Sequence, residues 1–150
     1  MVTLNVYDLH ESNAMLHSVG LGFYHSGIEI EIVGVSGPNT EYSFSPSGIS
    51  KTRPRLPDFG ELREQISVGT FNGGIRRVNE ILGALSSTFS PGAYNVTTLN
   101  CNSFSDAFCF AAMETHIPHW VNRVASVGAR LNIDPSASSS SSSRSGGVSS

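Results

Sequence analysis

Cys101 is the residue of this sequence best placed to act as a nucleophile. It follows Asn100, a residue type that often caps helices, and it opens a segment with helical spacing that runs to Met113. The free N–H groups of a first helical turn carry about half a positive charge, which lowers the pKa of a thiol and stabilises the thiolate. The same groups can bind an oxyanion. We therefore predict a low thiol pKa and an oxyanion site in one turn of helix.

A nucleophilic thiol needs a base that protonates the leaving group, and this base is usually a histidine. His25 is the best candidate among five histidines, because it begins the segment with the clearest strand-like alternation. On that segment it shares a polar face with Glu29 and Glu31. Taken singly, each residue has a plainer interpretation: a cysteine in a helix is often a small buried hydrophobe, and a strand histidine is often structural.

Other polar residues offer weaker signals. Asn100, Asn102 and Asp8 could orient the base or help to bind an oxyanion. His116 and His119 form an H-x-x-H motif, which could supply half of a metal site. Zinc usually requires three or four protein ligands, so we expect neither a metal nor another cofactor.

Apolar spacing predicts the elements that must position these residues. Strands are predicted at 2–7, 23–33 and 41–44, whereas 61–69 is ambiguous between a strand and a helical turn. Residues 36–60, rich in Gly, Pro and Ser, are predicted to be loops around one short strand. Strands followed by helices favour an α+β domain, a small antiparallel sheet packed with helices.

The second half of the sequence predicts three helices. The first has an apolar stripe and ends at Pro91-Gly92, the second runs from Cys101 to Met113, and the third starts at Pro118. The residues predicted to face the core are Ile75, Val78, Leu82, Leu85 and Phe89 in the first, Phe104, Phe108 and Ala111 in the second, and Trp120, Val121 and Val124 in the third.

Composition limits the class of protein. The chain has 150 residues with a net charge of −3, which predicts one domain and argues against a nucleic-acid binder. We place the folded domain at 1–131 and a Ser-rich disordered tail at 132–150. No apolar run is long enough for a membrane span.

The two cysteines indicate a reducing environment. Cys101 and Cys109 would be about 12 Å apart in one helix, too far for a disulfide. The N-terminus lacks the basic start of a secretory signal. We therefore expect two free thiols and a cytoplasmic location, with the nucleus as a second compartment.

Several blocks in order along the chain resemble the PPPDE superfamily, which contains the DeSI-type (desumoylating isopeptidase) and deubiquitinase-like cysteine peptidases. The matching blocks are L-N-V-Y-D-L at 4–9, G-L-G-F-Y-H-S-G-I-E-I at 20–30, E-Y-S-F-S-P-S-G-I at 41–49, Y-N-V-T-T-L-N-C-N-S-F-S at 94–105 and I-P-H-W-V-N-R-V-A at 117–125. The resemblance covers nearly all of residues 2–130, and the combination of blocks is specific although no single block is.

The resemblance implies a permuted papain-like α+β fold in which the histidine precedes the cysteine. It implies a Cys101–His25 dyad that removes ubiquitin or a ubiquitin-like modifier such as SUMO from protein conjugates. Small residues near the histidine, including Gly22, Ser26 and Gly27, would allow a substrate backbone to approach closely. The chain departs from the family pattern at Ser103, where some members have histidine, and over 31–40.

Three other functions remain open at this stage. The same dyad could hydrolyse S-acyl thioesters on proteins, as in depalmitoylation. A similar N-C-x-x-F block occurs in lecithin:retinol acyltransferase-like proteins, which transfer lipid acyl groups. A non-catalytic modifier-binding module is the third possibility, with the Pro54-Arg55-Leu56-Pro57 loop and the Ser-rich tail as interaction segments.

Overall fold

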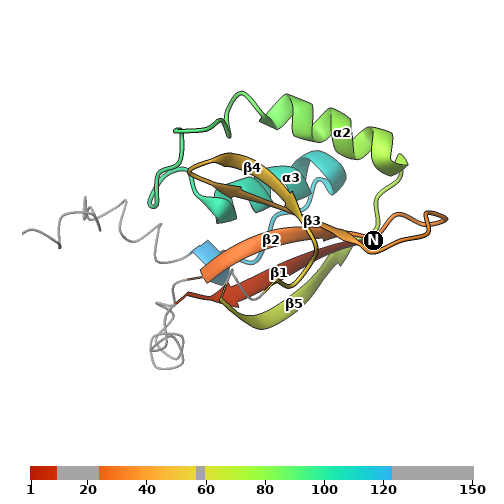
Figure 1. Ribbon diagram of the computed structural model, residues 1–150, viewed down its shortest axis with the longest axis horizontal. Helices are drawn as coiled ribbons and strands as arrows, with labels where there is room; N and C mark the ends of the chain where they lie inside the picture. Colours follow the sequence, from red (N-terminus) through yellow and green to blue (C-terminus); the bar gives the residue numbers. More distant parts are fainter. Residues whose placement is uncertain (10–23, 57–59, 123–150) are drawn as a thin grey trace, which may run out of the picture.

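The computed structural model describes residues 1–9, 24–56 and 60–122. Within them, five strands form one antiparallel sheet in the order β4-β3-β2-β1-β5 (Figure 1). The elements are β1 (Val2–Asp8), β2 (Tyr24–Ile30), β3 (Thr40–Ser45), β4 (Gly48–Thr52), β5 (Glu61–Gly69), α2 (Gly74–Leu85), α3 (Cys101–Met113) and the short 3₁₀ helix η2 (His119–Asn122). The predicted α+β class is confirmed, and the histidine strand β2 precedes the cysteine helix α3.

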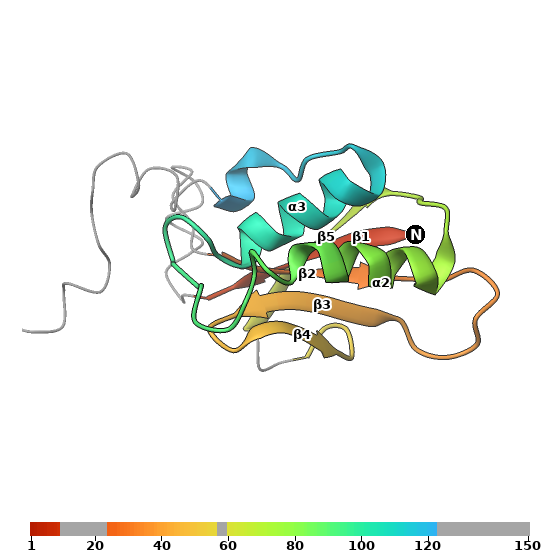
Figure 2. The same ribbon diagram turned by 90° about the horizontal axis from the view of Figure 1, so that it is seen from above.

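The two α-helices lie on the same side of strands β1, β2 and β5 (Figures 1 and 2). Helix α3 packs against the central strands β2 and β3, and α2 packs against α3. Between helices and sheet lies the apolar core, which includes Leu4, Val6, Ile28, Phe44, Val78, Phe104 and Phe108. The cysteine helix therefore lies directly over the histidine strand.

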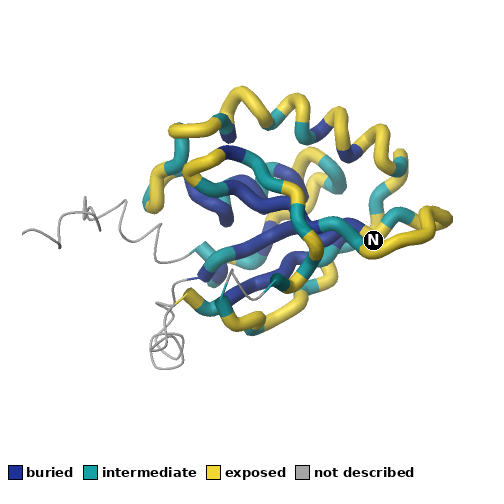
Figure 3. Tube along the Cα trace, viewed as in Figure 1, coloured by how far each residue is buried: buried dark blue, intermediate teal, exposed yellow. Residues whose placement is uncertain are grey.

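Alternation along β1 and β2 divides the sheet into two faces, as the sequence predicted. Val6 and Ile28 belong to the apolar core, whereas Asn5 and Glu29 extend to the opposite face. The opposite face is not a solvated one, however, because Asn5 and Glu29 are also buried. Much of the central part of the sheet is coloured as buried in Figure 3.

The segment 36–60 contains two strands rather than the predicted one. A two-residue turn, Pro46-Ser47, joins β3 to β4, and Gly48 starts β4 with a φ of 97° that favours glycine. Strand β4, G-I-S-K-T, has a single large apolar residue and lies at the sheet edge, so hydrophobic alternation gave no signal. The hairpin implied by the family resemblance at 41–49 is present.

Residues 61–69, which the sequence left ambiguous between a strand and a helical turn, form the edge strand β5. Helix α3 has the predicted bounds, but Ala111 is exposed rather than core-facing, and Ala112 packs against the core instead. Helix α2 ends at Leu85, before the predicted stop at Pro91.

The apolar stripe predicted for this helix is confirmed at most of its positions, because Leu82 and Leu85 pack against the core and Phe89, just beyond α2, is buried. Ile81, which the predicted stripe omitted, is buried, whereas Ile75 is 50% exposed. Val78 occupies the centre of the buried face as expected. Ile75, at the start of α2, is therefore the member of the predicted stripe that lies outside the core.

Several predictions concern residues outside the described ranges: Gly22, Val124 and the tail 132–150. The predicted third helix is described only as η2, in which Val121 is buried. None of the helices in the described ranges combines the length and apolar character needed to cross a membrane.

Candidate active site

The first turn of α3 is fixed by a reciprocal cap. The Asn100 side chain accepts a hydrogen bond from the Ser103 N–H at 3.0 Å, and the Ser103 hydroxyl accepts one from the Asn100 N–H at 3.1 Å. This arrangement is a capping box built with serine in the third helical position. Ser103, where some family members have histidine, therefore completes the N-terminal cap of α3 in this chain.

Asn100 also ties the cap to two other segments. Its Nδ2 donates to the Val96 carbonyl at 2.8 Å and to Asn122 Oδ1 at 3.2 Å. We expect Asn100→Ala to lower the free energy of unfolding by about 2 kcal/mol, at the upper end for a helix cap. Urea denaturation would measure this loss. Ser86→Ala, which removes an exposed hydroxyl bonded to the Gly83 carbonyl, is the control expected to change stability by less than about 0.5 kcal/mol.

The chain before α3 forms a tight loop whose two ends, Asn95 and Leu99, are paired with each other. Asn95 and Leu99 exchange backbone hydrogen bonds of 2.8 and 2.9 Å, and Asn95 Oδ1 accepts from the N–H groups of Thr97 and Thr98. Side-chain acceptance of this kind stabilises a turn locally. As a result Tyr94, seven residues before the cysteine, is near enough to Cys101 for the thiol to contribute to the raised pKa of the tyrosine. The thiol itself donates to Asn102 Oδ1 at 3.8 Å.

The Cys101 thiol is buried, with 3% of the residue exposed. Burial raises the pKa of the thiol above its ordinary value, although hydrogen bonds from the Ser26 N–H, the Tyr94 hydroxyl and the N–H groups of Asn102 and Cys101 act in the opposite direction. The prediction of a lowered thiol pKa is therefore wrong. Desolvation disfavours the thiolate more than the helix start favours it.

A buried polar contact joins α3 to β2 on both sides of His25. The Ser26 hydroxyl lies 2.6 Å from Asn102 Oδ1 and 2.8 Å from the Ser105 hydroxyl. The Asn102 Nδ2 donates to the Tyr24 carbonyl at 3.3 Å. The residues before and after His25 are therefore bonded to the first turns of the cysteine helix, and the Cys101 sulfur adjoins the His25–Ser26 peptide.

His25 lies at the start of β2, where the strand no longer pairs with β3. The β2–β3 pairing extends only over Ile28–Ile30 among the described residues. On the other side of β2, the cross-strand neighbour of His25 is Tyr7. Burial lowers the pKa of His25 to about 4, so its imidazole is neutral at physiological pH.

The two asparagines predicted as oxyanion or orienting residues direct their amide groups into the protein. Both N–H bonds of the Asn102 amide are occupied, by the carbonyls of Tyr24 and Val121, and its Oδ1 accepts from Ser26. The Asn100 amide is bonded to Val96 and Asn122. Both side chains thus position the first turn of α3, and the backbone N–H groups remain the candidates for oxyanion binding.

The other candidate residues lie elsewhere or are already engaged. His116 pairs with Asp106 at 2.9 Å and stacks on Phe110 at the exposed end of α3. Asp8 pairs with Arg63 at 3.2 Å. No group of three metal-binding side chains occurs in the described residues. Cys109 is a free, fully buried core thiol, as predicted.

Sequence analysis did not identify Tyr94 as a site residue. The signal was present, because a tyrosine opens the cysteine block and Asn95 follows it with a turn-forming side chain. Only the loop closure from Asn95 to Leu99 shows that the tyrosine reaches the sulfur. The predicted space above Gly27 is also absent, since the Glu41 side chain fills it.

Comparison with known proteins agrees with this architecture. The model of the family described as "PPPDE putative peptidase domain" matches residues 1–135. The chain belongs to this family. A DeSI-like protein of Arabidopsis thaliana is 33% identical over 137 residues, covering 87% of this chain and 58% of the relative. The "Desumoylating isopeptidase 1 homolog" of Caenorhabditis elegans is 30% identical, covering 87% of this chain and 40% of the relative.

A DeSI-like protein of Schizosaccharomyces pombe is 31% identical, covering 85% of this chain and 65% of the relative. The chain therefore spans less than two thirds of the length of these PPPDE relatives. At the family level it belongs to a peptidase family, and the relative from Caenorhabditis elegans is the one named as a desumoylating isopeptidase homolog.

Proposed function

We propose that this PPPDE chain is a cysteine isopeptidase that removes ubiquitin or SUMO from lysine side chains, with Cys101 as nucleophile and His25 as base. The observation that carries the proposal is the buried contact between β2 and the first turn of α3: the Ser26 hydroxyl lies 2.6 Å from Asn102 Oδ1, so the chain neighbours of His25 and Cys101 are bonded to each other. Membership of the peptidase family and similarity to a desumoylating isopeptidase homologue support it.

In this proposal the sulfur and the imidazole meet at the open edge of β2. Strand β2 pairs with β3 only from Ile28 onward, so the edge near His25 is not covered by a β3 ladder. The first turn of α3 occupies this place, held by Asn102 and Ser26. The modifier's C-terminal tail would enter as an extended chain along the same edge.

The reaction follows from ordinary thiol chemistry. The Cys101 Sγ attacks the carbonyl carbon of the modifier's C-terminal glycine while His25 accepts the thiol proton. The C–N bond then breaks as His25 returns this proton to the lysine amine, which leaves a thioester on Cys101. His25 next takes a proton from water, the hydroxide attacks the thioester, and the thiol is restored.

The backbone at the start of α3 would stabilise the tetrahedral intermediate. The backbone N–H groups of Cys101, Asn102 and Ser26 lower the pKa of the buried thiol, so they favour negative charge at this place. The negative charge of the intermediate forms on the carbonyl oxygen, two bonds away from the sulfur, where these N–H groups could reach it. The Tyr94 hydroxyl adds a fourth donor, which burial and the neighbouring thiol keep protonated, with its pKa raised to about 12.

The protonation states of Cys101 and His25 before the reaction indicate when the proton moves. They favour transfer from thiol to imidazole during the attack, rather than a thiolate–imidazolium ion pair that exists beforehand. Burial raises the pKa of Cys101 and lowers that of His25 to about 4, so both are neutral near pH 7. A neutral imidazole is the form that can accept the thiol proton. We therefore assign His25 as a general base in the first step.

A covalent probe tests the proposal. Ubiquitin and SUMO carrying a C-terminal electrophile are incubated with the full chain, and the adduct is mapped by mass spectrometry. We expect one adduct, at Cys101, with at least one of the two modifiers. Cys101→Ser should abolish it, whereas Cys109→Ala, which removes the other thiol, should retain it.

Four outcomes would overturn the proposal. One is the absence of an adduct with both modifiers, and another is an adduct that persists in Cys101→Ser. Release of fatty acid from an S-acylated peptide without modifier cleavage would assign an S-acyl thioesterase instead. Modifier binding without an adduct would assign a binding module.

A further inference from the structure

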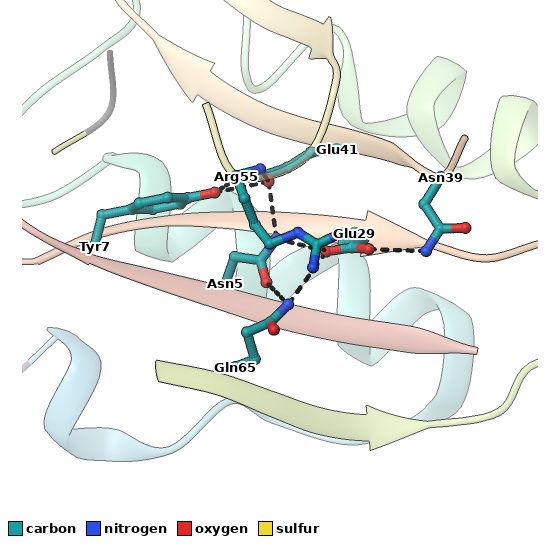
Figure 4. Close-up of polar contacts among 7 residues, drawn as sticks. All are labelled: Asn5, Tyr7, Glu29, Asn39, Glu41, Arg55 and Gln65. Atoms are coloured by element: carbon teal, nitrogen blue, oxygen red, sulfur yellow. Dashed lines mark hydrogen bonds and ion pairs between the residues drawn. The ribbon is translucent and has the colours of Figure 1, made fainter. Parts of the chain in front are cut away.

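The face of the sheet opposite the helices contains a buried polar cluster that the proposed reaction does not use. Its four fully or nearly fully buried members are Asn5 and Tyr7 on β1, Glu29 on β2 and Glu41 on β3 (Figure 4). Asn39, Arg55 and Gln65 surround them. The cluster thus lies on the side of β2 that carries the His25 side chain.

Glu41 is the centre of this cluster. Its carboxylate accepts from the Tyr7 hydroxyl at 2.8 and 2.9 Å, from Asn5 Nδ2 at 2.8 Å and from the Arg55 N–H at 3.0 Å. The Glu41 residue is 0% exposed. A buried carboxylate needs such donors, because water cannot solvate it.

Glu41 reaches β1 by crossing over Gly27 of the intervening strand. A Cβ atom on Gly27 would overlap Glu41 Oε1 and lie 2.7 Å from its Cδ. The missing side chain at 27 is therefore what allows the Tyr7–Glu41 hydrogen bond to form across β2. The small residue beside His25 accommodates this glutamate rather than a substrate.

Glu29 strengthens the same arrangement. It pairs directly with Glu41 across β2 and β3, and it accepts from Asn5 at 2.9 Å and from Asn39 at 2.8 Å. Arg55 lies 3.8 Å from Glu29 through its guanidinium Nε. The carboxylates of Glu29 and Glu41 thus both accept hydrogen bonds from Asn5. Arg55 contacts both carboxylates, Glu41 through its backbone N–H and Glu29 through its guanidinium group.

Tyr7 links the cluster to His25. The two residues are cross-strand neighbours, and their ring centroids lie 5.7 Å apart with the planes inclined at 38°. At the far end of the ring, the hydroxyl is held by both oxygens of Glu41. The phenol ring can therefore neither rotate away nor retreat without breaking buried hydrogen bonds.

We propose that Tyr7, anchored by Glu41, is a positioning residue that restricts the His25 ring to the orientation that meets Cys101; this inference rests on the proposed function. A catalytic histidine normally needs a third group to orient it. The amides of Asn100 and Asn102, two of the groups expected for that role, bond to other partners. The Tyr7 ring supplies such an orienting contact, because its centroid lies 5.7 Å from that of the imidazole.

The test compares Tyr7→Phe, Glu41→Gln and the double variant in the full chain. Tyr7→Phe keeps the ring and removes its anchor, and Tyr42→Phe removes the hydroxyl of another buried tyrosine, on the apolar face, as the matched control. The first readout is kcat and KM on a modifier with a fluorogenic C-terminal amide. The second is the His25 side-chain rotamer, followed by NMR couplings and by contacts between the two rings.

We expect Tyr7→Phe to lower kcat about tenfold with KM unchanged within about twofold, and to produce rotamer averaging at His25. Glu41→Gln should lower kcat by a similar factor, and the double variant by no more than either alone, because both break the same link. Tyr42→Phe should leave kcat and the rotamer unchanged.

The inference is overturned if folded Tyr7→Phe retains the wild-type kcat and a single His25 rotamer, or if Tyr42→Phe has the same effect. The NMR arm needs no substrate. If the wild-type chain turns over neither modifier, the proposed function fails while the rotamer comparison still decides whether Tyr7 orients His25.

Discussion

Replacing His25 with glutamine should lower kcat/KM for modifier cleavage by about 10³-fold, the largest kinetic effect expected of any residue except Cys101. Glutamine retains a similar size and polarity but cannot accept the thiol proton or return it to the lysine amine. Since the Cys101 thiol has a raised pKa from burial, little thiolate forms without the base. Steady-state turnover of the fluorogenic modifier substrate measures the loss.

The pH profile identifies the base. The pKa of His25 is lowered to about 4 by burial, so kcat/KM of the wild type should rise as the pH increases through about 4 and the imidazole loses its proton. The His25→Gln variant should lack this acid limb. His116→Gln, which changes an exposed histidine paired with Asp106, is the control expected to keep both the rate and the limb. Equal profiles in wild type and His25→Gln would contradict the assignment.

The same burial makes folding sensitive to acid. In the unfolded chain His25 has a pKa of about 6.5, above its value in the folded protein. Between pH 6.5 and about 4 the unfolded state therefore binds a proton that the folded state does not, and stability falls as the pH decreases. This contribution amounts to about 2–3 kcal/mol. It should disappear from urea-unfolding curves of His25→Gln measured over this range.

Replacing Gly27 with alanine should lower the free energy of unfolding by about 3 kcal/mol, the largest loss of stability expected from adding one methyl group. The new Cβ would occupy the position of the Glu41 carboxylate. Glu41 would then have to leave Tyr7 and Asn5, whose donors would remain buried without their acceptor. Thermal or urea denaturation measures the loss, with a fall in melting temperature of about 10 °C.

Gly83→Ala is the matched control for this substitution. Gly83 lies in α2, and a Cβ there would meet no atom within 4 Å. Alanine at an exposed helical position should raise stability by up to about 1 kcal/mol. A Gly27→Ala protein as stable as the wild type would show that the Glu41 side chain can leave Gly27 at no cost, and that the buried cluster is not rigid.

Local patterns in the sequence predicted the elements whose stability depends on near neighbours in the chain. Asn100 and Ser103 form a cap three residues apart, and the bounds of α3 follow from it. Alternation in β1 and β2 predicted which residues face the core, because side chains in a strand point to opposite faces in turn. The family blocks added the order of histidine and cysteine, and the matching family model confirmed that membership.

Tertiary structure decided what surrounds those residues. The pKa of the Cys101 thiol depends on its burial and on Ser26 and Tyr94, which lie on strand β2 and in the loop before α3. In the sequence, Glu29 and Glu41 look like strand residues that face solvent. Strand pairing instead places them opposite each other, where Tyr7 bonds to Glu41 and Arg55 pairs with Glu29. Sequence periodicity reports the face on which a side chain lies. Desolvation and hydrogen bonding depend on the partners that the fold places on that face, and these partners lie tens of residues away.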